Sequence, residues 1–256
     1  MNILDQIIKH KTNEVAKLKQ SIILPFSDPV DQPKIRRFDL TIKKDGPINF
    51  ITEFKRASPS KGMIRKDADP SAIGVTYAAH GAAAISVLTD SKFFHGSEED
   101  LLAIRQSVSV PVLRKEFIID EYQIHETAEM GADALLLIVA ALDDGRLKSF
   151  HRIADIYGLH CLVEVHNEAE LHRALNADSR IIGINNRDLT NFTVNLSTSL
   201  NLIRKIPNDV ITISESGIIT RSDVLLLEEA GFDAILVGES LMRASNIGEH
   251  LDILMG

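Results

Sequence analysis

The stretch EYQIHETAEMGADALLLIV, residues 121–139, contains the unit whose repetition decides the fold. Glu121–Met130 carries apolar residues at helical spacing, and Ala132–Val139 is an almost continuous apolar run, typical of a strand buried on both faces. Gly131 lies between them, where a left-handed residue commonly ends a helix. The stretch therefore predicts a helix that turns tightly into a buried parallel strand.

The same unit recurs along the chain. HGAAA at 80–84 and AGFDA at 230–234 repeat the turn MGADA at 130–134. Glycine follows the helical segments at Gly81, Gly131, Gly158 and Gly231, and further helices are predicted at Leu147–Tyr157 and Ser222–Ala230. Eight apolar runs predict strands at Ile48–Lys55, Ala83–Thr89, Val110–Phe117, Ala132–Val139, Cys161–His166, Arg180–Asn185, Val210–Ser216 and Ala234–Glu239.

Eight strands that alternate with helices favour a closed (β/α)8 TIM barrel over an open parallel sheet. An open sheet of the dinucleotide-binding kind would normally carry a GxGxxG turn after its first strand, and the sequence has none there. Since no linker or break in composition divides the chain, we expect one α/β barrel domain over residues 1–256.

The residues ahead of the first strand are patterned differently. Ile3–Gln20 predicts an amphipathic helix, and the poorly patterned stretch that follows, to about Pro47, predicts a loop or lid. Residues 1–47 are thus expected to form an N-terminal helical extension and loop. The pattern leaves open whether this extension covers the mouth of the barrel and excludes water, or covers its bottom.

Composition limits the class of function. The 256 residues carry a formal net charge of −8, which disfavours nucleic acid and anionic membranes as partners. The longest apolar run, Ala134–Leu142, is too short to span a bilayer, and the N-terminal residues lack the apolar core of a signal peptide. The single Cys161 has apolar neighbours, so we expect a core position rather than a nucleophile, in a protein of the reducing cytoplasm.

Polar side chains stand at the ends of five predicted strands, where barrel enzymes place their active sites. They are Glu53 and Lys55, then Arg114, Lys115 and Glu116, then Glu164, then Asn185, Asn186 and Arg187, and finally Ser214, Glu215 and Ser216. Any one of these groups could be a structural ion pair or a helix cap. Because an unpaired buried ion costs several kcal/mol, the convergence of glutamates and lysines favours a site that transfers protons.

Two turns suggest a phosphate site. SESG and VGES follow the seventh and eighth strands, where barrels often bind phosphate. Gly217 and Gly238 would let backbone N–H groups approach an anion, a short helix from about Glu239 would point its positive end at it, and Lys55 would add a formal charge. The alternative is that these glycines only form tight turns.

Other signals are weaker. The nine histidines are scattered and no His or Cys cluster has metal-ligand spacing, so no metal site is expected. His166 follows the fifth strand and is expected to be a surface or loop residue. The aromatic pair in DSKFFHGS, residues 90–97, either packs over a ligand or anchors its own loop.

Seven motifs together resemble the indole-3-glycerol-phosphate synthases, in their order and spacing. They are FITEFKRASPSKG, VLTDSKFFHGS, PVLRKEFIIDEYQI, LVEVH, IGINNRDL, SESGI and LVGESLM, and the resemblance extends from the N-terminal helix to the last helix. With no second barrel appended, the chain resembles the monofunctional form. Glu116 stands where the family motif is expected to have Asp, and Phe54 where an aliphatic residue is common.

The resemblance implies a carboxy-lyase of tryptophan biosynthesis. Its substrate would be 1-(2-carboxyphenylamino)-1-deoxyribulose 5-phosphate, which ring closure, decarboxylation and dehydration convert to indole-3-glycerol phosphate. It implies that no cofactor is needed and that the partner is a small phosphorylated molecule. It also implies a monomer or weak homodimer, which can associate with other enzymes of the tryptophan pathway.

The resemblance further implies roles for individual residues. Lys115 would be the general acid of ring closure, and Glu164 would stabilise the positive charge that forms on the substrate. Lys55 and Glu53 would serve the dehydration, although Lys115 acting twice stays open. The remaining positions are Asn185 and Glu215, which would orient hydroxyls and hold the lysines; Ser58, which would support the first loop; Phe117 and Leu189 around the aromatic ring; Arg187 on the carboxylate; and Ser216, Gly217, Gly238, the backbone N–H of Glu239 and Lys55 on the phosphate.

Two other classes of function stay open on the residues alone. One is a different phosphosugar isomerase or aldolase that uses Lys115 as a Schiff-base nucleophile. The other is a barrel that binds a phosphorylated ligand without catalysis, since a fold alone does not prove activity.

Overall fold

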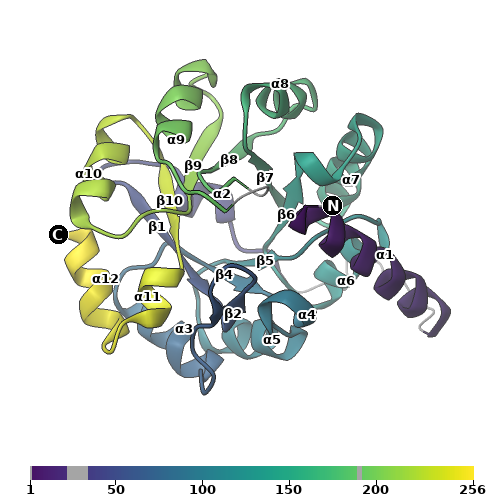
Figure 1. Cartoon of the computed structure of the whole chain (residues 1–256), viewed down its shortest axis with the longest axis horizontal. Coiled ribbons are helices and arrows are strands. Elements are labelled where there is room, and N and C mark those ends of the chain that lie inside the picture. Colours follow the sequence, from purple (N-terminus) through teal and green to yellow (C-terminus); the bar gives the residue numbers. More distant parts are fainter. Residues whose placement is uncertain (1, 22–33, 189–191) are drawn as a thin grey trace.

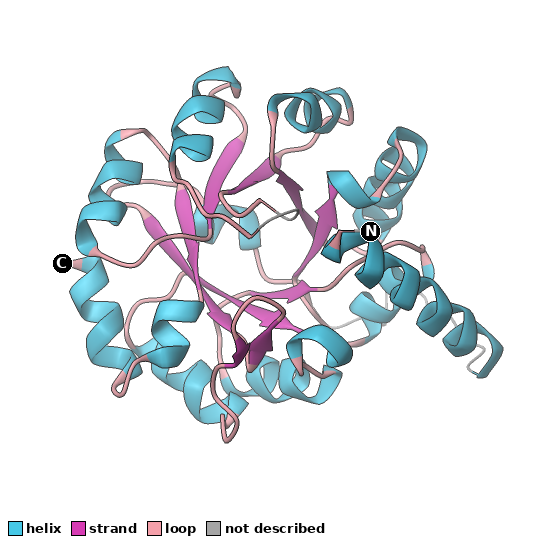
Figure 2. Ribbon diagram, in the orientation of Figure 1, coloured by secondary structure: helices cyan, strands magenta, loops and turns pink. Residues whose placement is uncertain are grey.

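Eight parallel strands close into a barrel that is surrounded by helices (Figures 1 and 2). The structure is a computed structural model that describes residues 2–21, 34–188 and 192–256. Each strand pairs with its neighbour in the sequence, and the last pairs with the first to close the ring. The barrel strands are β1 (Asn49–Phe54), β4 (Ala84–Leu88), β5 (Val112–Lys115), β6 (Ala134–Ile138), β7 (His160–Val165), β8 (Ile181–Asn185), β9 (Ile211–Glu215) and β10 (Ala234–Val237).

The helices follow the strands, and two more precede the first strand. They are α1 (Ile3–Ser21), α2 (Phe38–Ile42), α3 (Pro70–Ala79), α4 (Ser91–Phe94), α5 (Glu98–Ser107), α6 (Tyr122–Glu129), α7 (Asp144–Ile156), α8 (Glu168–Asn176), α9 (Ser197–Leu202), α10 (Arg221–Glu229), α11 (Glu239–Arg243) and α12 (Ile247–Met255). Short 3-10 turns lie at Val139–Ala141 and Ile203–Lys205, and β2 (Ala57–Ser58) pairs with β3 (Gly62–Met63) as a small hairpin after β1. The predicted (β/α)8 barrel with an extra N-terminal helix is confirmed.

All eight predicted strands are present, most of them shorter than predicted. The glycines expected to end helices do adopt left-handed backbone angles, at Gly81, Gly131, Gly158 and Gly231. The helix α7 begins three residues before the predicted start, because the side chain of Asp143 accepts a hydrogen bond from the backbone N–H of Arg146 and caps it.

Two apolar clusters build the molecule, one on each side of the sheet. The outer cluster packs the helices against the outward faces of the strands. The inner cluster fills the barrel below its mouth with side chains such as Ile51, Leu113, Leu162 and Ile213. Cys161, expected in the core, is instead partly buried against the outer cluster, and burial raises the pKa of its thiol.

The bottom of the barrel is closed by α2, which the sequence analysis did not predict. Phe38 and Ile42 are fully buried in the inner cluster, against residues at the start of the strands such as Ala84 and Ile211. The expectation of a loop up to Pro47 is therefore wrong over Phe38–Ile42, while residues 22–33 of that stretch lie outside the described residues. Within the described ranges, no helix combines the length and the apolar content needed to cross a membrane.

Candidate active site

The interior of the barrel changes from apolar to charged along each strand. Because alternate residues of a strand face the same side, Ile51, Glu53 and Lys55 project inward from β1 and the loop after it. Leu113 and Lys115 do the same on β5. The apolar floor therefore gives way to a layer of ions at the carboxyl ends of the strands, where the sequence analysis expected a site.

A cavity of about 690 Å³ opens above this layer. Leu136, Leu236 and Ile138 line its apolar part. The predicted site residues that line it are Glu53, Lys55, Ser58, Lys115, Phe117, Glu164, Asn185, Arg187, Ser216, Gly217, Gly238 and Glu239. The barrel thus brings together twelve of the fourteen predicted positions, which come from β1, β5, β7, β8, β9 and β10 and the loops after them.

Lys115 lies at the centre of the ionic layer. Its Nζ makes a very short contact with Oε2 of Glu215 and lies 3.7 Å from Oε2 of Glu53 and 3.8 Å from Oε2 of Glu164. Burial alone would lower the pKa of Lys115, but these three carboxylates outweigh it and raise the pKa. The three carboxylates therefore favour the charged ammonium form of this side chain over the neutral amine.

Glu53 joins the two lysines. Nζ of Lys55 lies 2.5 Å from Oε1 of Glu53, and Lys115 approaches the other oxygen. Burial would raise the pKa of Glu53, but the charges of Lys55 and Lys115 prevail and lower it. Gly238 makes room for this carboxylate, because a Cβ at that position would lie 2.7 Å from Cβ of Glu53.

Glu164 is held by His166, which the sequence analysis did not predict as part of the site. Nε2 of His166 lies 3.2 Å from Oε1 of Glu164, and the side chain of Asn185 also bonds this carboxylate. Burial opposes ionisation, but His166 and Lys115 lower the pKa of Glu164 to about 2. His166 lies in the loop directly after β7, as expected, but its side chain is not on the surface, because it is only 12% exposed.

Glu215 lies beneath the cavity and does not line it. Burial, with Glu164 and Glu53 nearby, raises its pKa to about 7 against the opposing effect of Lys115. Burial and the two neighbouring carboxylates therefore favour the protonated form of Glu215. This position supports the predicted role of holding a lysine, whereas direct contact with substrate hydroxyls does not fit it.

The rim carries apolar and hydroxyl groups. Phe117 packs against Phe94 with ring centroids 5.9 Å apart, and both line the cavity. Phe93 instead packs against His10 of α1, so one ring of the aromatic pair faces the cavity and the other anchors the loop. Ser58 is buried, and its Oγ has no hydrogen-bond partner among the described residues. The predicted contact Leu189 lies outside the described residues.

The turns after β9 and β10 have the backbone expected of an anion site. Ser216 and Gly217 both have positive φ, at 67° and 83°. A Cβ on Gly217 would lie 2.5 Å from Cγ1 of Val194, so only glycine fits there. Arg187 lies beside this region, with Nη2 3.6 Å from Oε2 of Glu239, whereas Lys55 is committed to Glu53.

Helix α1 lies at the mouth of the barrel, where Ile3, Leu4 and Ile7 line the cavity. The helix of the N-terminal extension therefore lies at the mouth rather than at the bottom, which α2 closes, while residues 22–33 lie outside the described residues. The sequence analysis named none of these three residues, since their helical spacing shows an apolar face without showing what it covers.

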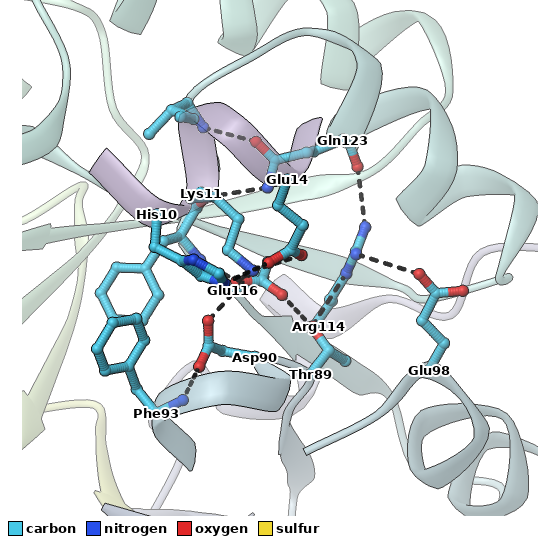
Figure 3. A network of polar contacts seen from close by, with 12 residues as sticks. His10, Lys11, Glu14, Thr89, Asp90, Phe93, Glu98, Arg114, Glu116 and Gln123 are labelled. Carbon is cyan, nitrogen blue, oxygen red and sulfur yellow. Dashed lines mark hydrogen bonds and ion pairs between the residues drawn. The ribbon is translucent and has the colours of Figure 1, made fainter. Parts of the chain in front are cut away.

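A buried lysine fixes α1 to the barrel (Figure 3). Nζ of Lys11, 1% exposed, lies 3.2 Å from Oδ2 of Asp90 and 3.1 Å from Oε1 of Glu116, and also pairs with Glu14. Burial opposes the charge, but these carboxylates raise the pKa of Lys11. Thr89 donates a hydrogen bond to the other oxygen of Glu116. Glu116, the departure from the expected motif, is thus part of the anchor.

Comparison with known proteins identifies the family. The family model for indole-3-glycerol phosphate synthase matches residues 4–254. Proteins of that name from Chlorobaculum tepidum and Acetivibrio thermocellus are 49% and 47% identical to this chain, over 96% and 97% of it and 98% and 97% of their own lengths. One from the Paris strain of Legionella pneumophila is 45% identical, over 99% of this chain and 98% of its own length.

Solved structures with lower identity share the fold alone. The 3-hexulose-6-phosphate synthase of Salmonella typhimurium aligns with a TM-score of 0.65 at 12% identity, over 81% of this chain and 97% of that one. The thiamine phosphate pyrophosphorylase of Pyrococcus furiosus aligns at 0.61 and 14%, over 84% and 94%. Family membership therefore rests on the sequence matches: the chain belongs to the indole-3-glycerol phosphate synthase family, as its strand-end motifs predicted.

Proposed function

We propose that this chain converts 1-(2-carboxyphenylamino)-1-deoxyribulose 5-phosphate to indole-3-glycerol phosphate, carbon dioxide and water. The family carries this lyase activity, and a small phosphorylated substrate fits it. The observation that carries the proposal is the position of Lys115 at the floor of the cavity, with its Nζ held among three carboxylates.

Ring closure makes the first demand on the site. The ring carbon that bears the carboxylate attacks the carbonyl carbon of the sugar, and the electrons of the C=O bond move to oxygen. Lys115 gives that oxygen a proton, because its ammonium is the buried acid nearest the centre of the layer. The attack leaves positive charge on the substrate ring and nitrogen. The ionised Glu164, which lines the cavity, stabilises that charge.

Decarboxylation and dehydration follow. Loss of carbon dioxide returns an electron pair to the ring and restores its aromaticity. The hydroxyl then leaves as water after accepting a proton, and a base removes the remaining proton from the adjacent carbon. Lys55 and Glu53 are the acid and base for this step, and their 2.5 Å contact lets one proton return between them. Glu215, with a pKa near 7, can re-protonate Lys115 between turnovers.

Substrate contacts divide the cavity. Phe117, with Phe94, forms an aromatic wall for the anthranilate ring, and Arg187 takes its carboxylate. Ser216, Gly217, Gly238 and the backbone N–H of Glu239 take the phosphate, and the positive φ angles of Ser216 and Gly217 support an anion-binding turn there. Lys55 is a weaker candidate for a phosphate contact, because Glu53 already holds its charge.

The two rival functions have less support. A Schiff base needs a neutral lysine, and the carboxylates around Lys115 stabilise its charged form. A barrel that only binds its ligand would have no use for a buried acid and base pair, whose desolvation costs several kcal/mol. Borohydride treatment with substrate should therefore trap no lysine adduct.

The test is direct. Purified protein is mixed with the carboxyphenylamino-deoxyribulose phosphate without added metal or cofactor, and indole fluorescence and carbon dioxide release are followed together. We expect equal amounts of both products. Binding of the substrate without either product would contradict the proposal.

Cytoplasmic location and a monomeric or weakly dimeric state belong to the same proposal. A single partly buried cysteine and a biosynthetic family support the first. Sedimentation of the purified chain, alone and mixed with other enzymes of the tryptophan pathway, tests the second.

A further inference from the structure

His166 lies between two carboxylates at the edge of the site. Its Nδ1 lies 2.9 Å from Oε2 of Glu170, and its Nε2 lies 3.2 Å from Oε1 of Glu164. The second contact is an ion pair rather than a well-aligned hydrogen bond. Within the described part of the chain, His166 does not line the cavity, whereas Glu164 does.

The start of α8 fixes the ring from behind. Asn167 caps this helix by accepting a hydrogen bond from the backbone N–H of Glu170, and its side-chain amide donates to Oε1 of Glu170 at 2.6 Å. The backbone N–H of His166 donates to Oε2 of the same carboxylate at 2.9 Å. Glu170 is therefore immobilised by its own helix cap, and it orients the imidazole in turn.

A ring in this position is stable as a cation. Each nitrogen lies next to a carboxylate oxygen, and a neutral imidazole has only one N–H to offer. Burial lowers the pKa of a histidine, but Glu164 and Glu170 prevail and raise the pKa of His166 to about 10. The charged groups that face the ring are Glu164 from β7 and Glu170 from α8. The nearest lysine of the network is Lys115 of β5, on the far oxygen of Glu164.

We propose that His166 is a positioning residue, which Glu170 holds in its cationic form and which keeps the carboxylate of Glu164 ionised and aimed into the cavity. This inference rests on the proposed function, because Glu164 is the group that would face the cation formed during ring closure. Seven consecutive residues, Glu164–Glu170, supply the whole arrangement of carboxylate, imidazole and carboxylate.

The first test replaces the cation with a neutral amide, His166→Gln. We expect kcat to fall about 10- to 100-fold, the loss typical of one interaction with a charged group, while KM changes less than about threefold. The acidic limb of the kcat profile should move to higher pH by about one to three pH units, because Glu164 loses a neighbouring cation and takes up a proton more readily. The matched control is His172→Gln, an exposed histidine of α8 that pairs with Glu168.

The second test removes the outer carboxylate, Glu170→Gln. His166 then loses its proton more easily, so activity should fall on the alkaline side, the opposite limb from His166→Gln. A purely structural role would lower stability or kcat in both variants but would leave the acidic and alkaline limbs of the kcat–pH profile where they are. That result would overturn the proposal. A wild-type kcat in His166→Gln would also overturn it.

Two measurements keep the outcomes separate. Absence of indole product from the wild-type chain would refute the proposed function, whereas an active wild type with unaffected variants would refute only this inference. If the variants do not fold, the ring nitrogens of His166 in the wild-type protein are followed by NMR. They should stay doubly protonated up to pH 8, and a titration midpoint near the ordinary histidine value would overturn the inference.

Discussion

The two ends of the barrel are built from the same eight strands and have opposite chemistry. At the bottom, Phe38 and Ile42 of α2 seal an entirely apolar end of the inner cluster. At the mouth, a layer of lysines and glutamates faces a cavity roofed in part by α1. Every second side chain of a strand faces the barrel interior, from the bottom to the mouth. The sequence therefore decides only whether an apolar or a charged side chain faces inward at each height.

Stability and chemistry are placed at opposite ends of the barrel. Apolar contacts of Phe38 and Ile42 at the bottom stabilise the fold. Charged side chains at the mouth are costly to bury, and they are tolerated because lysines and glutamates neutralise one another. These paired groups can also exchange protons with a bound molecule. The two helices before β1 follow the same rule, since α2 is held by Phe38 and Ile42 and α1 by the charge of Lys11.

The contrast between the two ends requires that the charged residues at the mouth catalyse the reaction. Lys115→Met removes the ammonium while keeping a side chain of similar length. We expect kcat to fall about 10²- to 10⁴-fold, the contribution of one positioned acid, in a chain that remains folded by circular dichroism. Steady-state indole fluorescence measures the loss.

Lys148→Met on the exposed face of α7 is the control for removing a positive charge. It should retain wild-type kcat. Turnover of Lys115→Met within about threefold of wild type would show that the acid of ring closure is another group.

The bottom of the barrel predicts the reverse pattern. Phe38→Ala should lower the free energy of unfolding by about 3–5 kcal/mol, because it leaves a void in a fully buried position. Below its melting temperature the variant should keep its kcat, since α2 lies at the end opposite the cavity. The free energy of unfolding in urea and kcat at about 20 °C are measured on the same sample.

Leu40→Ala on the same helix is the matched control. Leu40 is 59% exposed, so its truncation should change stability by no more than about 0.5 kcal/mol. A large fall of kcat in folded Phe38→Ala would mean that the two ends are coupled.

A glycine inside the barrel links packing to the ionic layer. A Cβ on Gly183 would lie 2.1 Å from Oε1 of Glu215 and 3.0 Å from Leu162, so the carboxylate must shift in Gly183→Ala. We expect a loss of about 1–3 kcal/mol in stability and about a tenfold fall in kcat, as Lys115 loses its shortest contact. Unchanged stability together with unchanged kcat would show that Glu215 has room to move.

Local patterns explain why so much of the fold was predictable. Glycine turns and two-sided apolar strands are written in a few consecutive residues, and simple alternation decides which residues near the end of a strand face inward. Lys115 and Glu164 could therefore be chosen without coordinates. The distances between these side chains could not be predicted, since the stagger between neighbouring strands of the barrel decides which residues lie at the same height.

The missed features depend on contacts that no local pattern shows. Helix α2 has only two buried residues, too few for a periodic signal. Lys11 resembles any lysine of an amphipathic helix until Asp90 and Glu116 are placed beside it. His166 did carry a local signal, because Glu170 follows it by four residues at the start of a helix, and that spacing could have indicated a fixed ring.

The smallest expected effect concerns how α1 is held. Lys11→Met leaves Asp90 and Glu116 without their cation, and the cheapest relief is for α1 to separate and let water reach them. Ile3, Leu4 and Ile7 then leave the cavity wall. We expect KM to rise about tenfold, the loss of roughly one good apolar contact, with kcat within about threefold and faster hydrogen exchange in α1.

Lys9→Met, on the exposed face of the same helix, should leave both constants unchanged. If Lys11→Met instead lowered kcat and left KM alone, α1 would act on the ionic layer rather than on the roof, through Glu116, which contacts Lys11 and lines the cavity beside Lys115.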